Sequence, residues 1–182
     1  LYKVNIQDGT YTGTVIGDTI YTGGTYTFRT GSDPYVLDPG GAGAGVIMVS
    51  GQRRVYFNTL RQMNRPGITL NNGNVYLAFG SHGDNLPYHG WILGYDENTL
   101  ANSAVLNLNP NGSYDGIWQG GGRIDVDPQG YMYVETGNGS FDTTLNAQGF
   151  PINGDYGDSF VKIGVDSASS ATNQNTNGWG LK

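Results

Sequence analysis

Short apolar runs, each closed within about ten residues by a turn-forming residue, constrain the fold of this chain more than any other feature. The runs are rich in β-branched and aromatic residues, and Gly, Asn, Asp or Pro ends nearly every one. Such punctuation is typical of antiparallel strands joined by tight turns. The sequence therefore predicts an all-β fold. The expected strands are 14–20, 25–29, 46–49, 54–57, 75–79, 91–95, 104–108, 131–134 and 160–163.

The longest stretch without glycine, 95–111, is the one segment whose apolar residues recur at loose helical spacing. Asn and Ser crowd this segment, and their side chains compete with the backbone for the hydrogen bonds of a helix. We therefore expect a turn at 97–99 followed by a strand over 104–108 rather than a helix.

Composition indicates a folded domain without the charge needed to bind nucleic acid or a membrane surface. The 182 residues include 31 Gly and 7 Pro, a share that could indicate disorder. However, 37% of the chain is hydrophobic, which is enough for a core. Only 13% of residues are charged, and the formal net charge is −6. No apolar run approaches the roughly 20 residues needed to cross a bilayer. The absence of cysteine excludes disulfides and thiolate sites, and it fits an extracellular bacterial protein.

An internal repeat is the strongest long-range signal. NGNVYLAFG (72–80) and QGYMYVETG (129–137) share a turn glycine, apolar residues around a tyrosine and a closing glycine. Each is followed by a polar loop and a strand ending in Asp, WILGYD (91–96) and FVKIGVD (160–166), and LYKVN (1–5) reads as a third copy of that strand. A sheet-sized unit of this kind cannot bury both of its faces alone, so we expect it to stack against its neighbours.

These segments, together with GIWQGGG and GDYGDSFVKI, resemble the bacterial quinoprotein-like (PQQ-repeat-like) β-propellers that occur in secreted multidomain proteins. The resemblance implies blades that are four-stranded antiparallel sheets. It divides the chain into divergent partial blades over 1–61, a blade over 62–110, a blade with a loop insertion over 111–166 and a Ser/Asn/Thr-rich tail over 167–182. A propeller needs roughly four to eight blades, so the ring is incomplete. We expect a segment of a longer polypeptide, or a ring that partner subunits complete.

The loop over 80–90 holds both histidines of the chain. His82, Asp84, Asn85, Tyr88 and His89 could present hydrogen-bonding and stacking groups to a ligand at the mouth of a propeller. The favoured alternative is a long turn held by side-chain bonds to the backbone, with the histidines bonded to carbonyl groups. A zinc site built on the two histidines would lack a third protein ligand.

Loops rich in carboxylate oxygens favour calcium over zinc as the bound metal. Asp142, Asp155 and Asp158 are the candidate ligands, although the same carboxylates could simply stabilise a Gly-rich turn. Two glycosylation sequons begin at Asn111 and Asn138, both in predicted loops.

The segment GIWQGGG (116–122) places an indole beside an amide. Trp118 could stack on a sugar ring while Gln119 and Arg123 bond its hydroxyls. The favoured alternative is a tryptophan wedged between blades, with the glycines at 120–122 allowing close backbone approach.

The sequence lacks the basic and acidic groups that pyrroloquinoline quinone requires, so no organic cofactor is predicted. The leading hypothesis is a non-catalytic secreted or cell-surface propeller module with a structural or adhesive role, whose partners are neighbouring blades or subunits and glycans. One alternative is a carbohydrate-active or quinoprotein-type enzyme that uses His82, His89 and one of Asp84 or Asp158 at the propeller mouth. The other is a subunit of an extracellular polymer whose sheets pair edge to edge.

Overall fold

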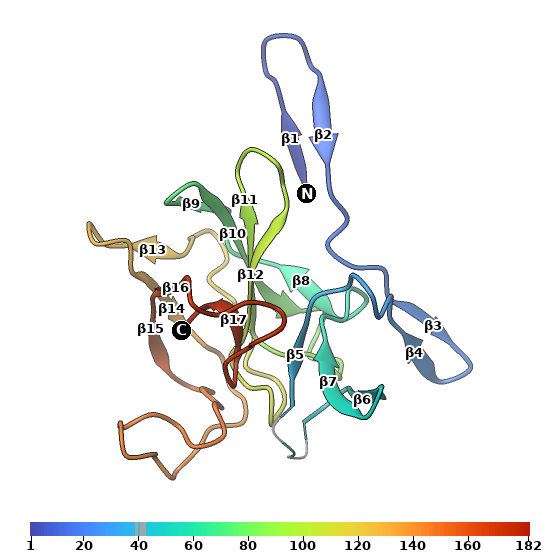
Figure 1. Cartoon of the computed structure of the whole chain (residues 1–182), viewed down its shortest axis with the longest axis vertical. Helices are drawn as coiled ribbons and strands as arrows, with labels where there is room; N and C mark the ends of the chain where they lie inside the picture. Colours follow the sequence, from blue (N-terminus) through green and yellow to red (C-terminus); the bar gives the residue numbers. More distant parts are fainter. Residues whose placement is uncertain (39, 41–42) are drawn as a thin grey trace.

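The fold consists entirely of short strands and loops (Figure 1). The computed structural model describes residues 1–38, 40 and 43–182; the three residues left out fall within the predicted partial blades over 1–61. In the described residues there are 17 strands in five sheets, every strand pair is antiparallel and there is no helix. This confirms the all-β prediction. Within the same residues nothing could cross a membrane as a helix.

The strands follow one another closely along the chain. They are β1 (Tyr2–Val4), β2 (Tyr11–Gly13), β3 (Ile20–Thr22), β4 (Thr25–Thr27), β5 (Tyr35–Leu37), β6 (Val46–Val49), β7 (Gln52–Tyr56), β8 (Gln62–Asn64), β9 (Thr69–Asn71), β10 (Asn74–Ser81), β11 (Trp91–Asp96), β12 (Asn102–Asn107), β13 (Asp125–Val126), β14 (Met132–Glu135), β15 (Phe160–Ile163), β16 (Val165–Asp166) and β17 (Gly178–Leu181).

Most predicted strands are present, and one is wrong. Strands β6 and β15 have the predicted bounds, and the turn at 97–99 is confirmed. The prediction of a strand over 14–20 is wrong, because only its last residue belongs to a strand. At its start Thr14 bonds to the backbone of Leu1, and near its end the Thr19 amide donates to the Thr59 hydroxyl at 3.1 Å.

The largest sheet is built around β10, the longest strand. Its strand order is β16-β17-β12-β11-β10-β8, and β9 pairs with a second part of β10. A two-residue turn, Asn72 and Gly73, joins β9 to β10, and both residues have positive φ (48° and 76°). Such a turn matches the right-handed twist of the strands that it connects, which fixes the register of this hairpin.

Both faces of this central sheet are buried. Side chains alternate between the faces of a strand, and in β10 both sets are apolar. One face packs against the sheet β13-β14-β15 and the segment before it, through Tyr76, Ala78, Ile92, Ala104, Leu106, Ile117, Ile124, Met132, Val134 and Ile163. The other face packs against β5 and β7, through Leu77, Phe79, Trp91, Leu93, Val105, Val36, Val55 and Phe57. Three sheets are therefore stacked face to face.

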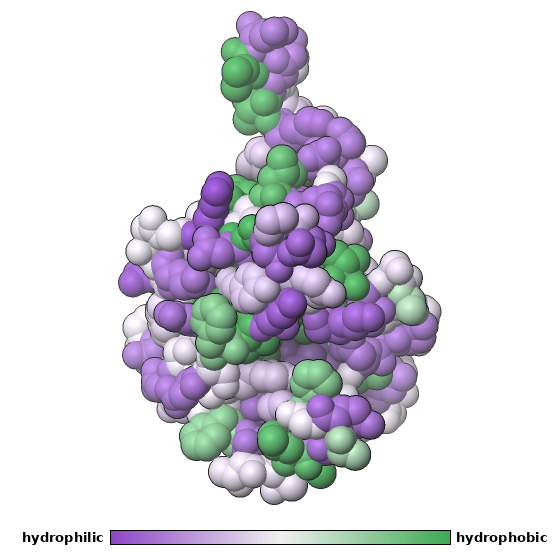
Figure 2. All heavy atoms as spheres, turned by 90° about the vertical axis from the view of Figure 1, so that its left-hand side faces the viewer, coloured by the Kyte–Doolittle hydropathy of each residue, from purple (hydrophilic) through white to green (hydrophobic). Residues whose placement is uncertain are grey.

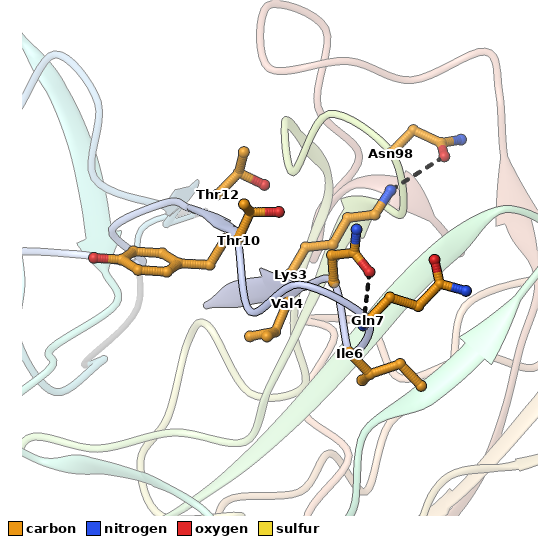
Figure 3. Close-up of a pocket in the computed structure, with 9 residues that line it drawn as sticks. Lys3, Val4, Ile6, Gln7, Thr10, Thr12 and Asn98 are labelled. Carbon is orange, nitrogen blue, oxygen red and sulfur yellow. Dashed lines mark hydrogen bonds between the residues drawn. The ribbon is translucent and has the colours of Figure 1, made fainter.

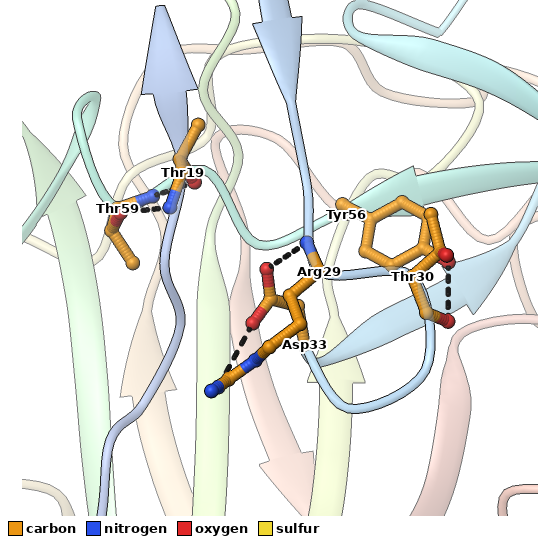
Figure 4. Close-up of polar contacts among 6 residues, drawn as sticks. All are labelled: Thr19, Arg29, Thr30, Asp33, Tyr56 and Thr59. Carbon is orange, nitrogen blue, oxygen red and sulfur yellow. Dashed lines mark hydrogen bonds and ion pairs between the residues drawn. The ribbon is translucent and has the colours of Figure 1, made fainter.

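Polar contacts anchor the chain that leads into β5 and β7 (Figure 4). Thr19 and Thr59 exchange hydrogen bonds, each hydroxyl accepting from the backbone amide of the other residue. Asp33 accepts a hydrogen bond from the Arg29 amide at 2.7 Å and pairs with the Arg29 guanidinium at 3.2 Å. The Tyr56 hydroxyl donates to the Thr30 carbonyl.

The two repeated segments have the same strand order. Strands β9, β10 and β11 form one antiparallel meander, and β13, β14 and β15 form the other. In the first unit β12 adds a fourth strand beside β11. Within the described residues no strand lies beside β15 in the corresponding place.

The tail over 167–182 contains a strand, β17, that its polar composition did not predict. Strand β17 pairs with both β12 and β16. Its position is supported by Asn177, whose side-chain amide donates to the carbonyls of Asn107 and Gly154, both at 2.7 Å.

We expect Ile92→Ala and Leu93→Ala to destabilise the protein by similar amounts, about 2–5 kcal/mol each. The two residues are adjacent on β11, face opposite sides of the central sheet and are fully buried. The free energy of unfolding in denaturant is the measurement, and Leu70→Ala, at a side chain that is 63% exposed, is the control, with an expected change within about 0.5 kcal/mol. A small effect from either core variant would contradict burial of both faces.

Candidate functional site

Polar loops from both repeat units meet at one end of the stacked sheets. Backbone hydrogen bonds tie them together: the Tyr114 amide donates to the Tyr88 carbonyl, and the Asp115 amide donates to the Asn138 carbonyl. The Tyr156 amide likewise donates to the Leu108 carbonyl. We call residues 81–90, 108–119, 136–142 and 153–159 the loop cluster. Its residues include most of those that the sequence singled out.

The loop between β10 and β11 is held mainly by its own side chains. The Ser81 hydroxyl accepts from the Asp84 amide at 3.0 Å, and the Asn85 side chain donates to the His82 carbonyl at 2.9 Å. The buried Tyr88 hydroxyl donates to the Asp84 carboxylate at 2.7 Å. These bonds match the turn that the sequence favoured for this loop.

The two histidines lie in different environments. His82 is exposed, whereas His89 is 2% exposed. Nε2 of His89 lies 2.7 Å from the Ala44 carbonyl, and Nδ1 lies 3.1 Å from both oxygens of Asn109. Burial lowers the pKa of His89, and the oxygens of Ala44 and Asn109 oppose that shift. The geometry therefore favours a structural role for His89, bonded to carbonyl groups as the sequence suggested.

Asp115 is the most unusual ionisable group of the loop cluster. The residue is completely buried, has a positive φ of 65°, and neither carboxyl oxygen has a hydrogen-bond partner. Burial raises the pKa of Asp115 to about 9, the charges of Asp155 and Asp158 add to the shift, and the Thr136 hydroxyl opposes it. That hydroxyl donates its hydrogen bond to the Tyr156 carbonyl at 2.6 Å. Asp115 is thus a neutral carboxylic acid at pH 7.

Asp155 and Asp142 organise the loop inserted between β14 and β15. The Asp142 carboxylate accepts from the amide and side chain of Asn153 and from the Asp155 amide. Asp155 accepts from the Asn111 amide at 3.1 Å, and burial raises the pKa of Asp155 to about 6. Both carboxylates therefore cap backbone groups, which is the turn-stabilising alternative for this loop.

The predicted calcium ligands Asp142, Asp155 and Asp158 stay a prediction, and they do not form a group of three neighbouring carboxylates. Across residues 1–38, 40 and 43–182, no three His, Asp or Glu side chains are grouped closely enough to hold a metal ion. The zinc alternative fails the same test, since His82 and His89 lack a third ligand.

Trp118 is half-buried where the two repeat units meet. Its indole packs on the backbone of Gly80, Gly116 and Gly137, and a Cβ atom at Gly80 would lie 2.8 Å from the ring. The guanidinium of Arg65 lies 5.7 Å from the ring centroid. The indole is therefore wedged between units, as the sequence favoured. The glycines that admit it are not those of the turn over 120–122, which contact the indole nowhere in the described contacts.

The remaining predicted residues lie around this indole and on the nearby loops. Gln119 is half-buried, and its side-chain oxygen has no hydrogen-bond partner, whereas Arg123 is exposed. Of the two sequons, Asn138 is exposed and Asn111 is half-buried. The fold thus brings Trp118 close to Arg65, a residue that no sequence motif singled out.

Comparison with known proteins adds no assignment, because no family model, curated protein or solved structure matches this chain. The function is therefore argued from the geometry of the loop cluster and of the sheets.

We expect Asp115→Asn to stabilise the protein at pH 8 and to have a smaller effect near pH 4. The folded pKa of about 9 lies above the usual 3.8, so the stability of the wild type falls as pH rises between these values. The asparagine removes this dependence of the unfolding free energy on pH, whose slope is at most about 1.4 kcal/mol per pH unit. Unfolding free energies across this pH range are the measurement.

Asp125→Asn is the control for this experiment, because Asp125 is exposed on β13. It should leave the pH profile unchanged. An unchanged slope in Asp115→Asn would mean that the carboxyl of Asp115 is ionised and paired in the folded protein.

Proposed function

We propose that this chain is a β-propeller-type module with a non-catalytic, structural or adhesive role in a secreted or cell-surface protein. The observation that carries the proposal is the face-to-face stack of three sheets, in which the central one is buried on both faces. Stacked antiparallel sheets of a repeated unit are how propeller blades cover one another. The common strand order of the two repeat units supports the same interpretation.

The surface around Trp118 supports carbohydrate as the ligand of this module. A half-buried indole packs on three glycines, the guanidinium of Arg65 lies 5.7 Å from its ring centroid, and the half-buried Gln119 is the next residue in the chain. An aromatic face stacks on the C–H groups of a sugar ring, while amide and guanidinium groups bond its hydroxyls. A chain with only 13% charged residues and a formal net charge of −6 suits an uncharged glycan better than a polyanion.

The enzyme alternative receives less support from the same loops. It requires His82, His89 and one of Asp84 or Asp158 at a common pocket. His89 is instead buried against Ala44 and Asn109, and Asp84 is bonded to Tyr88.

The polymer-subunit alternative is favoured by the hairpin β1–β2, which projects from the body of the molecule (Figure 1). Its exposed apolar side chains include Ile6, 96% exposed, and Tyr2, 70% exposed. One side-chain bond, from Lys3 to Asn98 at 3.5 Å, connects the hairpin with the β11–β12 turn (Figure 3). A two-stranded hairpin is marginally stable in water, so contact with a further protein surface would stabilise it.

Binding of the intact protein to a glycan array, with and without Trp118→Ala, tests the carbohydrate proposal. We expect the substitution to weaken binding about tenfold, the contribution of one stacked aromatic ring. Tyr131→Ala, at an exposed aromatic residue on the second repeat unit, is the control and should bind as the wild type does.

Trp118→Ala also removes packing between the repeat units, so a second variant isolates the ligand contact. Gln119→Ala keeps the indole in place and should weaken binding by a smaller factor. Unchanged glycan binding in both variants, with the fold intact, would rule out this surface as the platform.

A further inference from the structure

Arg65 and Arg123 differ from the other arginines in their polar contacts. Four of the six arginines of the chain form a hydrogen bond or an ion pair with another side chain: Arg29, Arg53, Arg54 and Arg61. In the described part of the chain Arg65 and Arg123 form neither, and both residues are exposed. The N–H donors of these two guanidinium groups are therefore available to a ligand.

The two arginines project from the same face of two neighbouring segments. A parallel β-bridge pairs Gly67 with Arg123, and a Cβ atom at Gly67 would lie 3.6 Å from that of Arg123. Residues opposite one another in such a bridge share a face, and so do residues two apart on an extended segment, as Arg65 and Gly67 are. Pro66 and Ile124, which each follow one of the arginines, are buried, as expected for the opposite face.

Arg65 also lies against the indole that the carbohydrate proposal uses. The carbon of its guanidinium group is 5.7 Å from the centroid of the Trp118 ring. Contact with an aromatic ring holds a guanidinium in place without using its N–H groups, which remain free to bond a carboxylate. The indole therefore positions one of the two unpaired cations.

The surroundings of the two arginines favour a small anionic group over a long polyanion. No carboxylate within the described residues forms an ion pair with either guanidinium. The formal net charge of −6 opposes a polyanion, but a single carboxylate requires only local donors. Figure 2 views the side on which β9 and β13 lie, and hydrophilic side chains cover much of it.

We propose that Arg65 and Arg123 bind the carboxylate of an acidic sugar, such as a uronic acid, whose ring lies against Trp118. This inference deepens the carbohydrate proposal and rests on it. It names the class of glycan, which is one that carries a carboxylate on a single unit. The indole contacts acidic and neutral sugars alike, so the two arginines set the preference between them.

Two oligosaccharides that differ in one unit, glucuronic acid in one and glucose in the other, are the probes. We expect the intact protein to bind the acidic one about tenfold more tightly at low ionic strength, because its hydrogen bonds are charge-assisted. The preference should shrink as salt is added, since both arginines are exposed. Equal affinity would overturn the inference and leave the carbohydrate proposal standing, whereas binding of neither oligosaccharide would contradict both.

The variants Arg65→Gln and Arg123→Gln test the assignment to these two residues. Glutamine keeps a polar side chain but removes the charge, so each variant should lose several-fold of the preference and bind the neutral oligosaccharide nearly as the wild type does. Lys3→Gln removes the same charge from β1 on the projecting hairpin and is the control, which should keep the full preference. An undiminished preference in the double variant of Arg65 and Arg123 would place the carboxylate elsewhere and overturn the inference.

Discussion

Burial of the central sheet on both faces is the constraint on which the rest of the molecule depends. Strand β10 carries apolar side chains on both sides, so each face needs a cover of its own. The sheets β5-β7-β6 and β13-β14-β15 supply these covers. Polar loops of both units meet at one end of these stacked sheets. The candidate site is therefore a product of how the sheets stack.

Local pattern was sufficient to predict most of the longer strands, because each depends on a short apolar run and its own turn. The short strands β2, β3, β5, β8, β9, β13 and β16 were not predicted, and neither was β17. Strand β17 depends on contacts with distant segments rather than on a local apolar run. Its segment is rich in Asn, Thr and Gly, and it is held by Asn177, which reaches carbonyl groups on β12 and on the inserted loop. In the wrongly predicted strand over 14–20, the Thr19 amide likewise bonds to a distant side chain, the Thr59 hydroxyl. Contacts between distant segments decided both cases.

In the candidate site, too, some contacts were predictable from the sequence and others were not. The loop over 80–90 was predictable as a self-bonded turn, because its partners lie within a few residues of one another. The burial of Asp115 was not, since it depends on the close approach of Gly90 and Gly139 from two other loops. Arg65 was missed because it is far from Trp118 in sequence and reaches the indole only through the fold. The sequence identified suitable residue types but not which of them meet.

The indole of Trp118 limits which residues can stand at three neighbouring positions. It occupies the space that side chains at Gly80, Gly116 and Gly137 would need, and these glycines lie on three separate segments. The identities of the four positions are thus linked through one shared volume. At Gly80 the three nearest atoms to an added Cβ all belong to the indole, so a larger residue there requires a smaller side chain at position 118.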